Sequence, residues 1–383
     1  INDERKRKNG GHEFTGQSCD TGELKADRSF ALDYITAVPR MALYMKYSIR
    51  IYDIYLKYVA PEDIHVYSID EVFMDVTDYL SMYQMTAEEL GITIMKDVLE
   101  TTGISSACGV GTNLYLAKVA LDILAKHSHD HIAALDEEYY RKKLWEHKPL
   151  TDFWRVGAGT ARRLERMGID TMRGIAETEE SMLYRLFGVD AELLIDHAWG
   201  REDNLISDIN AYRPKKNSIS SGQVLACDYD FEDGRLIVRE MTDLLALDLV
   251  DQGLVTNSIT LRVGYSYAWN KKPAHGTTTM SVTTNSARKI IAATEELYEK
   301  IVEEYVPIRR ITVTFNHVVS EMYQQYDLFT DPAETERENR IQKAVLEMKK
   351  RFGKNAVLKG MNLEEKGTTR ERNRQIGGHK SGV

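Results

Sequence analysis

The sequence has few cysteines and prolines and no long apolar run. Its 383 residues include seven prolines and only three cysteines, Cys19, Cys108 and Cys227. The cysteines lie far apart without C-x-x-C spacing, which argues against a disulfide framework or a cysteine zinc site and indicates a reducing compartment. No stretch approaches the roughly 18 consecutive apolar residues of a membrane span, and the start does not resemble a signal peptide. We therefore expect a cytoplasmic protein without a membrane partner.

The composition is that of a folded protein with more than one domain. Hydrophobic residues make up 43% of the chain and charged residues 28%, which is ordinary for globular proteins. The net charge of −9, from 50 Lys and Arg against 59 Asp and Glu, argues against a general polyanion binder. The chain begins at Ile1 rather than Met and runs directly into a polar stretch, as a fragment would.

Changes in residue pattern divide the chain into six segments and predict an α+β multidomain fold. Strand-like and helical stretches alternate in the second segment, helical periodicity alone fills the third, and strands separated by two helices form the fifth. The segments are a mobile polar start (1–35), an α+β unit (36–146), a helical unit (147–207), a polar linker (208–217), a second α+β unit (218–318) and a tail (319–383). Residues 340–383 hold twelve Lys or Arg against four Asp or Glu, which is typical of a DNA-facing or disordered tail.

An acidic pair, Asp70 and Glu71, interrupts an apolar strand pattern. Residues 65–77 are rich in β-branched and aromatic residues and predict a hairpin with the pair at its centre. Two adjacent charges are costly among apolar residues unless something neutralises them. Mg²⁺ prefers carboxylate oxygens and usually binds one or two of them together with substrate phosphates. The pair favours a magnesium site, and a structural turn stays open as the alternative.

Two motifs resemble those of the Y-family (UmuC/DinB-type) DNA polymerases. Residues 67–76, YSIDEVFMDV, resemble the S-I-D-E hairpin of that family, and residues 109–120, GVGTNLYLAKVA, resemble its second palm motif, G-I-x-x-N-K-x-L-A-K-x-A. The order and separation of the motifs match the family as well. The resemblance implies a translesion DNA polymerase of the SOS damage response that extends a primer 3′-OH with a dNTP. The sequence around the hairpin resembles that of the UmuC-type branch in Gram-positive bacteria.

The resemblance also implies roles for particular residues. Asp70 and Glu71 correspond to metal ligands and catalytic carboxylates, with two Mg²⁺ ions expected. Lys118 corresponds to the family lysine that contacts the incoming triphosphate, and Thr112 and Asn113, where the same helix opens, are further candidate nucleotide contacts. This is chemically sensible, because the start of a helix offers free N–H groups and a lysine adds a compact charge for phosphate. Without the motif, Lys118 would be interpreted as a surface lysine.

Beyond a mixed-sheet palm at 36–146, the resemblance implies an all-helical thumb at 147–207 and an α+β little-finger domain at 218–318. The turn V-G-A-G in the thumb, among arginines, predicts a helix-hairpin-helix, since glycines let a backbone approach phosphate closely. An ordinary helical turn with a solvated basic face is the alternative. The candidate DNA contacts are Gly157, Gly159, Arg162, Arg163, Arg309 and Arg310, with Arg262 as a further candidate. The expected partners are primer-template DNA and dNTP.

A short peptide in the tail is similar to the Q-L-D-L-F sequence by which bacterial polymerases dock on the sliding clamp. It consists of Gln325, Tyr326, Asp327, Leu328 and Phe329, where Tyr326 departs from the usual leucine. Leu328 and Phe329 would fill an apolar pocket while Gln325 orients the backbone. A plain loop is the alternative, and the position just after the last domain favours the docking peptide.

One motif of the family is missing from the sequence. The first motif, which carries a metal-binding aspartate, should precede the hairpin by several dozen residues, and it is absent together with the fingers residues that cover the dNTP. We therefore expect residues 1–35 to be a remnant of the fingers and the chain to be inactive without its N-terminus. The alternative is a catalytically inactive DNA-binding accessory that docks on the sliding clamp. A palm-fold nucleotidyl cyclase is a weaker alternative, because it has no use for the thumb or the clamp peptide.

Overall fold

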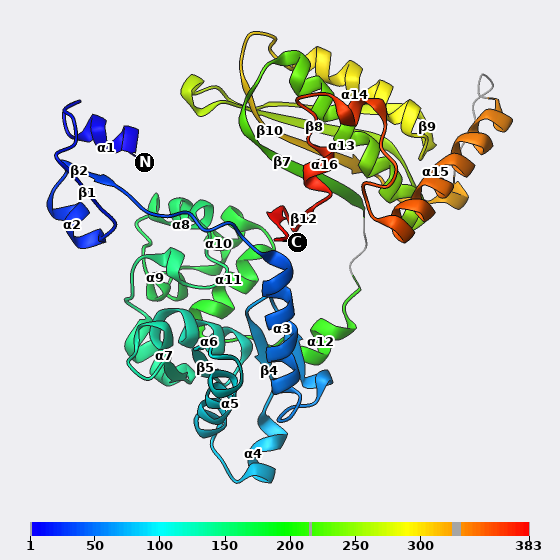
Figure 1. Cartoon of the computed structure of the whole chain (residues 1–383). Helices are drawn as coiled ribbons and strands as arrows, with labels where there is room; N and C mark the ends of the chain where they lie inside the picture. Colours follow the sequence, from blue (N-terminus) through cyan, green and yellow to red (C-terminus); the bar gives the residue numbers. More distant parts are fainter. Residues whose placement is uncertain (1, 214–216, 324–330, 383) are drawn as a thin grey trace. The chain divides into compact units, whose positions relative to one another are not determined.

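The computed structural model describes residues 2–213, 217–323 and 331–382 (Figure 1). The chain forms two compact units: residues 43–216 make up one, and residues 1–42 together with 217–383 make up the other. In the described residues, no helix is both long enough and apolar enough to cross a membrane.

The palm region contains the predicted hairpin and a second pair of strands. Strands β3 (Ile64–Val66) and β4 (Val72–Met74) are antiparallel, whereas β5 (Cys108–Gly111) and β6 (Ile132–Leu135) are parallel. The predicted mixed palm sheet thus consists of two separate two-stranded ladders. The α-helices of this region are α3 (Met41–Tyr55), α4 (Thr77–Tyr83), α5 (Ala87–Thr102), α6 (Leu114–Val119) and α7 (Glu137–Leu144).

Local sequence signals fix the start, the end and the buried face of helix α5. Thr86 caps the helix and forms a capping box with Glu89, and Gly103 ends it in the left-handed conformation. Leu90, Ile94 and Val98 recur every four residues and therefore bury one face of the helix in a small core.

The glycines of the second motif bring strand β5 directly against the helix that carries Lys118. A Cβ atom on Gly109 or Gly111 would overlap the backbone of Ala117 in α6, so only glycine fits at these two positions. The helix predicted from Leu114 to Lys126 is continuous but changes type. It runs from α6 through the π-helical turn η2 (Ala120–Leu124) into the 3₁₀ turn η3 (Ala125–His127).

The thumb region is helical, and residues 149–207 hold no strand, as the sequence predicts. Its helices are α8 (Ala158–Glu165), α9 (Met172–Ala176), α10 (Glu180–Phe187), α11 (Asp190–Trp199) and α12 (Ile206–Ala211). Tyr115 and Leu116 of α6 share one buried core with Leu164 and Met172 of the thumb. This shared core holds the thumb helices against the palm helix α6.

The little-finger region is an antiparallel sheet covered on one face by two helices. Strand β10 (Ile308–Asn316) lies between β7 (Ser218–Tyr229) and β8 (Leu254–Tyr265), and β8 also pairs with β9 (Ala274–Thr284) and β11 (Val319–Ser320). Helices α13 (Phe231–Gln252) and α14 (Ala287–Ile301) lie on the covered face (Figure 1). Alternate side chains of β10, those of Ile311, Val313 and Phe315, are fully buried in that core.

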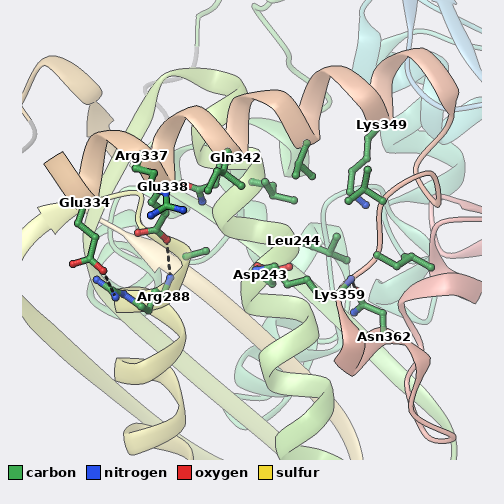
Figure 2. A pocket seen from close by; sticks show the side chains of 16 residues that line it. Asp243, Leu244, Arg288, Glu334, Arg337, Glu338, Gln342, Lys349, Lys359 and Asn362 are labelled. Atoms are coloured by element: carbon green, nitrogen blue, oxygen red, sulfur yellow. Dashed lines mark hydrogen bonds and ion pairs between the residues drawn. The ribbon is translucent and has the colours of Figure 1, made fainter.

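Residues 331–382 of the tail are folded, in contrast to the disordered alternative. Helix α15 (Pro332–Phe352) packs over α13 and the start of α14, where Arg288 pairs with Glu334, and a pocket of about 370 Å³ remains beneath it (Figure 2). Beyond α15, the buried Glu240 of α13 accepts hydrogen bonds from the side chain of Asn362 at 2.9 Å and the backbone N–H of Thr368 at 2.7 Å. A buried carboxylate is stable only with such partners, so Glu240 anchors the tail.

The expected mobile start is also structured. It contains α1 (Asn2–Lys8), α2 (Thr21–Ala26) and the parallel strands β1 (Gly16–Ser18) and β2 (Phe30–Leu32). The guanidinium group of Arg5 donates to the carbonyl oxygens of Phe30 and Leu24, each at 3.0 Å.

Candidate active site

The acidic pair lies in the turn between β3 and β4. The backbone N–H groups of Tyr67 and Ser68 both donate to the carbonyl oxygen of Glu71, each at 3.0 Å, and close the turn. Asp70 is exposed, and its carboxylate accepts a 2.7 Å hydrogen bond from the Ser68 hydroxyl. The turn breaks the strict alternation of a strand, so the two neighbouring carboxylates are not forced onto opposite faces.

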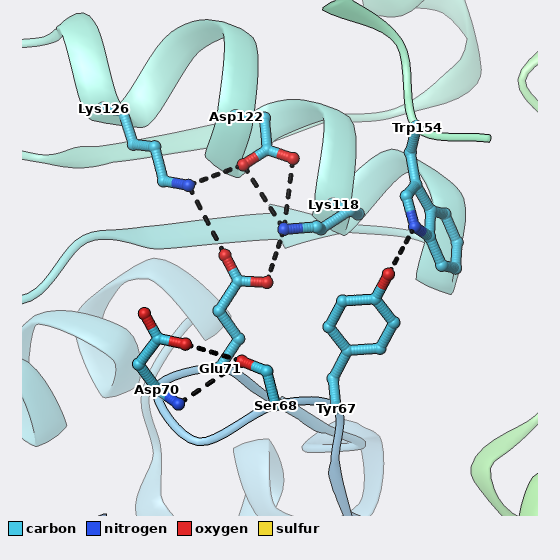
Figure 3. A network of polar contacts seen from close by, with 8 residues as sticks. All are labelled: Tyr67, Ser68, Asp70, Glu71, Lys118, Asp122, Lys126 and Trp154. Carbon is cyan, nitrogen blue, oxygen red and sulfur yellow. Dashed lines mark hydrogen bonds and ion pairs between the residues drawn. The ribbon is translucent and has the colours of Figure 1, made fainter. Parts of the chain in front are cut away.

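Glu71 belongs to a network of two carboxylates and two ammonium groups (Figure 3). One carboxylate oxygen lies 2.6 Å from Nζ of Lys118, and the other lies 3.4 Å from Nζ of Lys126. Asp122 bridges the same lysines, at 3.1 Å from Lys118 and 2.7 Å from Lys126. The Lys118 side chain is only 8% exposed, so it is a buried cation and not a surface lysine.

The sequence predicted Lys118 and Glu71 as site residues but missed Asp122 and Lys126. The spacing of these residues could have revealed them, since positions 118, 122 and 126 are four residues apart and therefore share one side of the predicted helix. The hydrogen bond with Asp122 is the main reason that the pKa of Lys126 is raised above its ordinary value.

The other two predicted nucleotide contacts, Thr112 and Asn113, lie just before α6 in different environments. Thr112 is exposed, whereas Asn113 caps the helix, and its side-chain oxygen accepts from the N–H of Leu116 at 2.8 Å. The amide nitrogen of Asn113 donates to the carbonyl oxygen of Gly200 at 2.9 Å. Both ends of the Asn113 side chain therefore have partners within the chain, and they join α6 to the end of α11.

Three aromatic rings join the acidic hairpin to the thumb. Tyr67 and Phe73 of the hairpin lie 5.6 Å apart between ring centroids, and both contact the ring of Trp154. The Lys118 ammonium lies 5.5 Å from the centre of the Tyr67 ring, a cation–π distance. The sequence analysis did not single out Tyr67 or Trp154.

The thumb turn presents glycines and arginines on an open surface. A Cβ atom at Gly157 or Gly159 would meet nothing within 4 Å, and Arg162 and Arg163 are exposed on α8. Arg155 has a positive φ of 72° and stacks over Trp154 at 5.0 Å. A positive φ is unusual for a residue with a side chain and often marks a functional turn.

The arginines of the little-finger sheet differ in environment. Arg309 forms a 3.3 Å ion pair with Asp228, whereas Arg310 is exposed next to a bulge in β10. Because Ile311 faces the helices, Arg310 and Thr312 face the uncovered side of the sheet, and Thr312 pairs with the exposed Arg262. The structure therefore brings Arg310 and Arg262 to one open face.

The donor chemistry of the hairpin fits a divalent cation. Asp70 has a free carboxylate edge, and Glu71 already attracts two ammonium groups, so hard anionic oxygens are concentrated at one turn. Within residues 2–213, 217–323 and 331–382, no group of three or more His, Cys, Asp or Glu side chains is arranged to hold a metal. The predicted clamp peptide, residues 325–329, lies outside the described residues.

Comparison with known proteins identifies the family. Residues 24–122 match the model of the impB/mucB/samB family, and residues 216–328 match its C-terminal domain. The DNA repair protein homolog YobH of Bacillus subtilis (strain 168) is 31% identical over 166 residues, which cover 43% of this chain and 75% of YobH. The chain belongs to the UmuC/DinB-type Y-family of DNA polymerases.

Other members of this family match most of the chain. A Bacillus subtilis (strain 168) protein named "Putative UV-damage repair protein UvrX" is 27% identical and covers 90% of this chain and 80% of its own length. DNA polymerase IV 2 of the same organism is 26% identical, with 89% and 81% covered. As a Y-family member, the chain is a DNA-directed DNA polymerase of the class that acts in DNA damage repair and translesion synthesis.

The fold agrees with this membership. A Y-family DNA polymerase chimera of Dbh and Dpo4 superimposes with a TM-score of 0.52 at 19% identity, covering 76% of this chain and 79% of the chimera. The predicted α+β multidomain polymerase architecture is confirmed. The domain boundaries and the individual site residues stay predictions.

Proposed function

We propose that this chain transfers the nucleotidyl group of a dNTP to a primer 3′-OH, with two Mg²⁺ ions held at Asp70 and Glu71. The observation that supports this most is the acidic turn itself, which presents two carboxylates beside the buried cation Lys118. Mg²⁺ bound there would neutralise phosphate charge and favour in-line displacement at phosphorus.

The chain's own residues then have separate tasks. Asp70 offers an exposed carboxylate, and Glu71 offers a second one that is held by lysines in this structure. Lys118 provides a compact positive charge for the triphosphate, and the exposed Thr112 lies just before Asn113, the residue that caps the same helix. Asn113 caps α6 and joins it to Gly200, since both ends of its amide side chain are engaged within the chain.

Primer-template DNA is the proposed partner of the basic surfaces. The thumb turn at Gly157 and Gly159, with its exposed arginines, suits the phosphate backbone because it offers charge and close approach without reading bases. Arg262 and Arg310 on the open sheet face add further phosphate contacts. The peptide at residues 325–329 is proposed to dock on the sliding clamp. A cytoplasmic location is also proposed, and the scarcity of cysteine supports it.

The catalytically inactive accessory is the second candidate. It is favoured by one observation, that in the part of the chain the structure describes, no third carboxylate joins Asp70 and Glu71 in a metal-binding group. An accessory of this kind would bind DNA through the same basic surfaces without extending a primer.

Primer extension on undamaged and abasic templates, by a protein that also carries the family's first motif, tests the proposal. Asp70→Ala is expected to lower the extension rate at least about 100-fold, because several kcal/mol of charge stabilisation would be lost. Asp78→Ala, at an exposed carboxylate in the first turn of α4, is the matched control and should extend normally. Extension that survives Asp70→Ala would overturn the metal assignment, and DNA binding without any extension by the unmutated protein that carries the first motif would support the accessory.

A further inference from the structure

We propose that Asp122 is a positioning residue: it is the counter-ion that lets Lys118 and Lys126 release Glu71 toward a divalent cation. The inference rests on the proposed function, because it presumes that Glu71 is a metal ligand. It concerns two residues, Asp122 and Lys126, to which neither the sequence motifs nor the family comparison gives a role.

Both carboxylate oxygens of Glu71 are engaged by lysines in this structure. Oε2 lies 2.6 Å from Nζ of Lys118, and Oε1 lies 3.4 Å from Nζ of Lys126. Glu71 can therefore offer oxygens to another cation only when these ammonium groups move away from it or are balanced elsewhere.

Lys118 cannot simply lose its partner. Its side chain is 8% exposed, and a buried ammonium group without a carboxylate is strongly unfavourable. The nearest aromatic group, the ring of Tyr67 at 5.5 Å, offers only a weak cation–π attraction. A second carboxylate is required if Glu71 is to change partners.

Asp122 is that second carboxylate. Its two oxygens lie 3.1 Å from Lys118 and 2.7 Å from Lys126, so it contacts both of the lysines that hold Glu71 (Figure 3). It lies in the π-helical turn η2, four residues after Lys118 and four before Lys126. π-helical turns are rare in proteins, and those that occur are often found at functional sites.

The helix that carries Asp122 is rigidly held. Val119 and Ala120, which precede it, are fully buried, and the start of α6 is capped by Asn113. Packing therefore fixes the backbone of Asp122 independently of Glu71, so its carboxylate can stay with the lysines when Glu71 turns away. Without Asp122, Glu71 would be the only carboxylate partner of both lysines among the residues that the structure describes, and the lysines would compete with the metal for it.

Mn²⁺ binding to the full chain tests this inference without any catalysis. Mn²⁺ is titrated into the protein, and the bound fraction is read from the loss of the free-ion EPR signal. Asp122→Asn is expected to weaken Mn²⁺ binding by about 10-fold, as for other residues that orient metal ligands. Asp122→Glu should restore most of the affinity, because it returns the carboxylate.

Lys126→Gln gives a prediction of the opposite sign. Its side chain is 47% exposed, so the variant is expected to fold, and removing this competitor for Glu71 should tighten Mn²⁺ binding by roughly 3-fold, the size expected for an exposed ion pair. A network that serves only stability would not produce opposite changes at Asp122 and Lys126. Asp97→Asn is the matched control, since Asp97 also pairs with a lysine, Lys57 at 2.9 Å, and should leave Mn²⁺ binding unchanged.

Glu71→Gln separates failure of this inference from failure of the proposed function. If Glu71→Gln leaves Mn²⁺ binding intact, the metal assignment itself is wrong. If Glu71→Gln weakens binding while Asp122→Asn binds like the unmutated chain, the proposed function stands and the role of Asp122 is overturned. Thermal melts in EDTA confirm that each variant is folded, and should Asp122→Asn fail to fold, Lys126→Gln decides alone.

Discussion

Trp154, at the start of the thumb, donates an indole N–H hydrogen bond of 3.0 Å to the hydroxyl of Tyr67 in the acidic hairpin. Tyr67 lies three residues before Asp70, and its ring lies under the Lys118 ammonium. The same contact therefore joins the thumb, the acidic turn and the buried cation. A shift of the thumb turn would therefore move the acidic hairpin through the contact between Trp154 and Tyr67.

Tyr67→Phe should lower the free energy of unfolding by about 1 kcal/mol, the usual net value of one hydrogen bond. Urea unfolding measures it. A double-mutant cycle with Trp154→Phe should show coupling of similar size, since both variants remove the same bond. Strictly additive effects would mean that the Tyr67–Trp154 contact contributes nothing to stability.

Gly111→Ala should destabilise the protein by at least about 3 kcal/mol, because the new Cβ atom would overlap the backbone of Ala117. Gly159→Ala is the matched control. A Cβ atom there meets nothing within 4 Å, and alanine in a helix is neutral or stabilising by up to about 1 kcal/mol. Equal unfolding midpoints for the two variants would contradict the close contact of β5 with α6.

Arg310→Gln should weaken binding to primer-template DNA and lower the slope of log Kd against log salt by about one. Arg309→Gln should change both quantities less, because Arg309 is already paired with Asp228 at 3.3 Å. Fluorescence anisotropy at several salt concentrations measures both variants. A larger loss for Arg309→Gln would show that the open sheet face is not the DNA surface.

His197 should make stability depend on pH. It is 2% exposed, stacks on Tyr115 at 3.9 Å, and burial lowers its pKa despite the 3.1 Å contact with Glu202. The unfolded chain therefore binds a proton more readily than the folded chain, so the free energy of unfolding should fall as the pH drops below about 6.5. Urea unfolding between pH 7.5 and 5.5 measures this slope, which should be smaller in His197→Gln; an unchanged slope would assign it to other groups.

The clamp peptide can be tested by a double substitution. Leu328→Ala with Phe329→Ala should abolish binding to the sliding clamp, because both anchor side chains are lost. Surface plasmon resonance with immobilised clamp measures this, and DNA binding of the same variant serves as the control. Clamp binding that persists in the double variant would show that another part of the chain docks.

Local patterns predicted much of the fold. The Thr86 capping box, the hairpin around Asp70 and the helices after residues 230 and 286 depend on neighbours a few residues apart, which sequence periodicity and turn chemistry describe. The docking of the tail on α13 was not predicted, because the anchor Glu240 lies far from Asn362 in sequence and has the pattern of an ordinary helix-surface carboxylate.

By itself, the sequence determined the acidic turn and the position of Lys118 on the helix that follows strand β5. Only the tertiary structure decided that Lys118 is buried against Glu71, that Asn113 is engaged with Gly200, and that Arg309, unlike Arg310, is neutralised. The physical reason is the range of the interactions. Capping, turns and periodicity act between near neighbours, whereas burial and charge pairing depend on residues that the folded core brings together from distant parts of the chain.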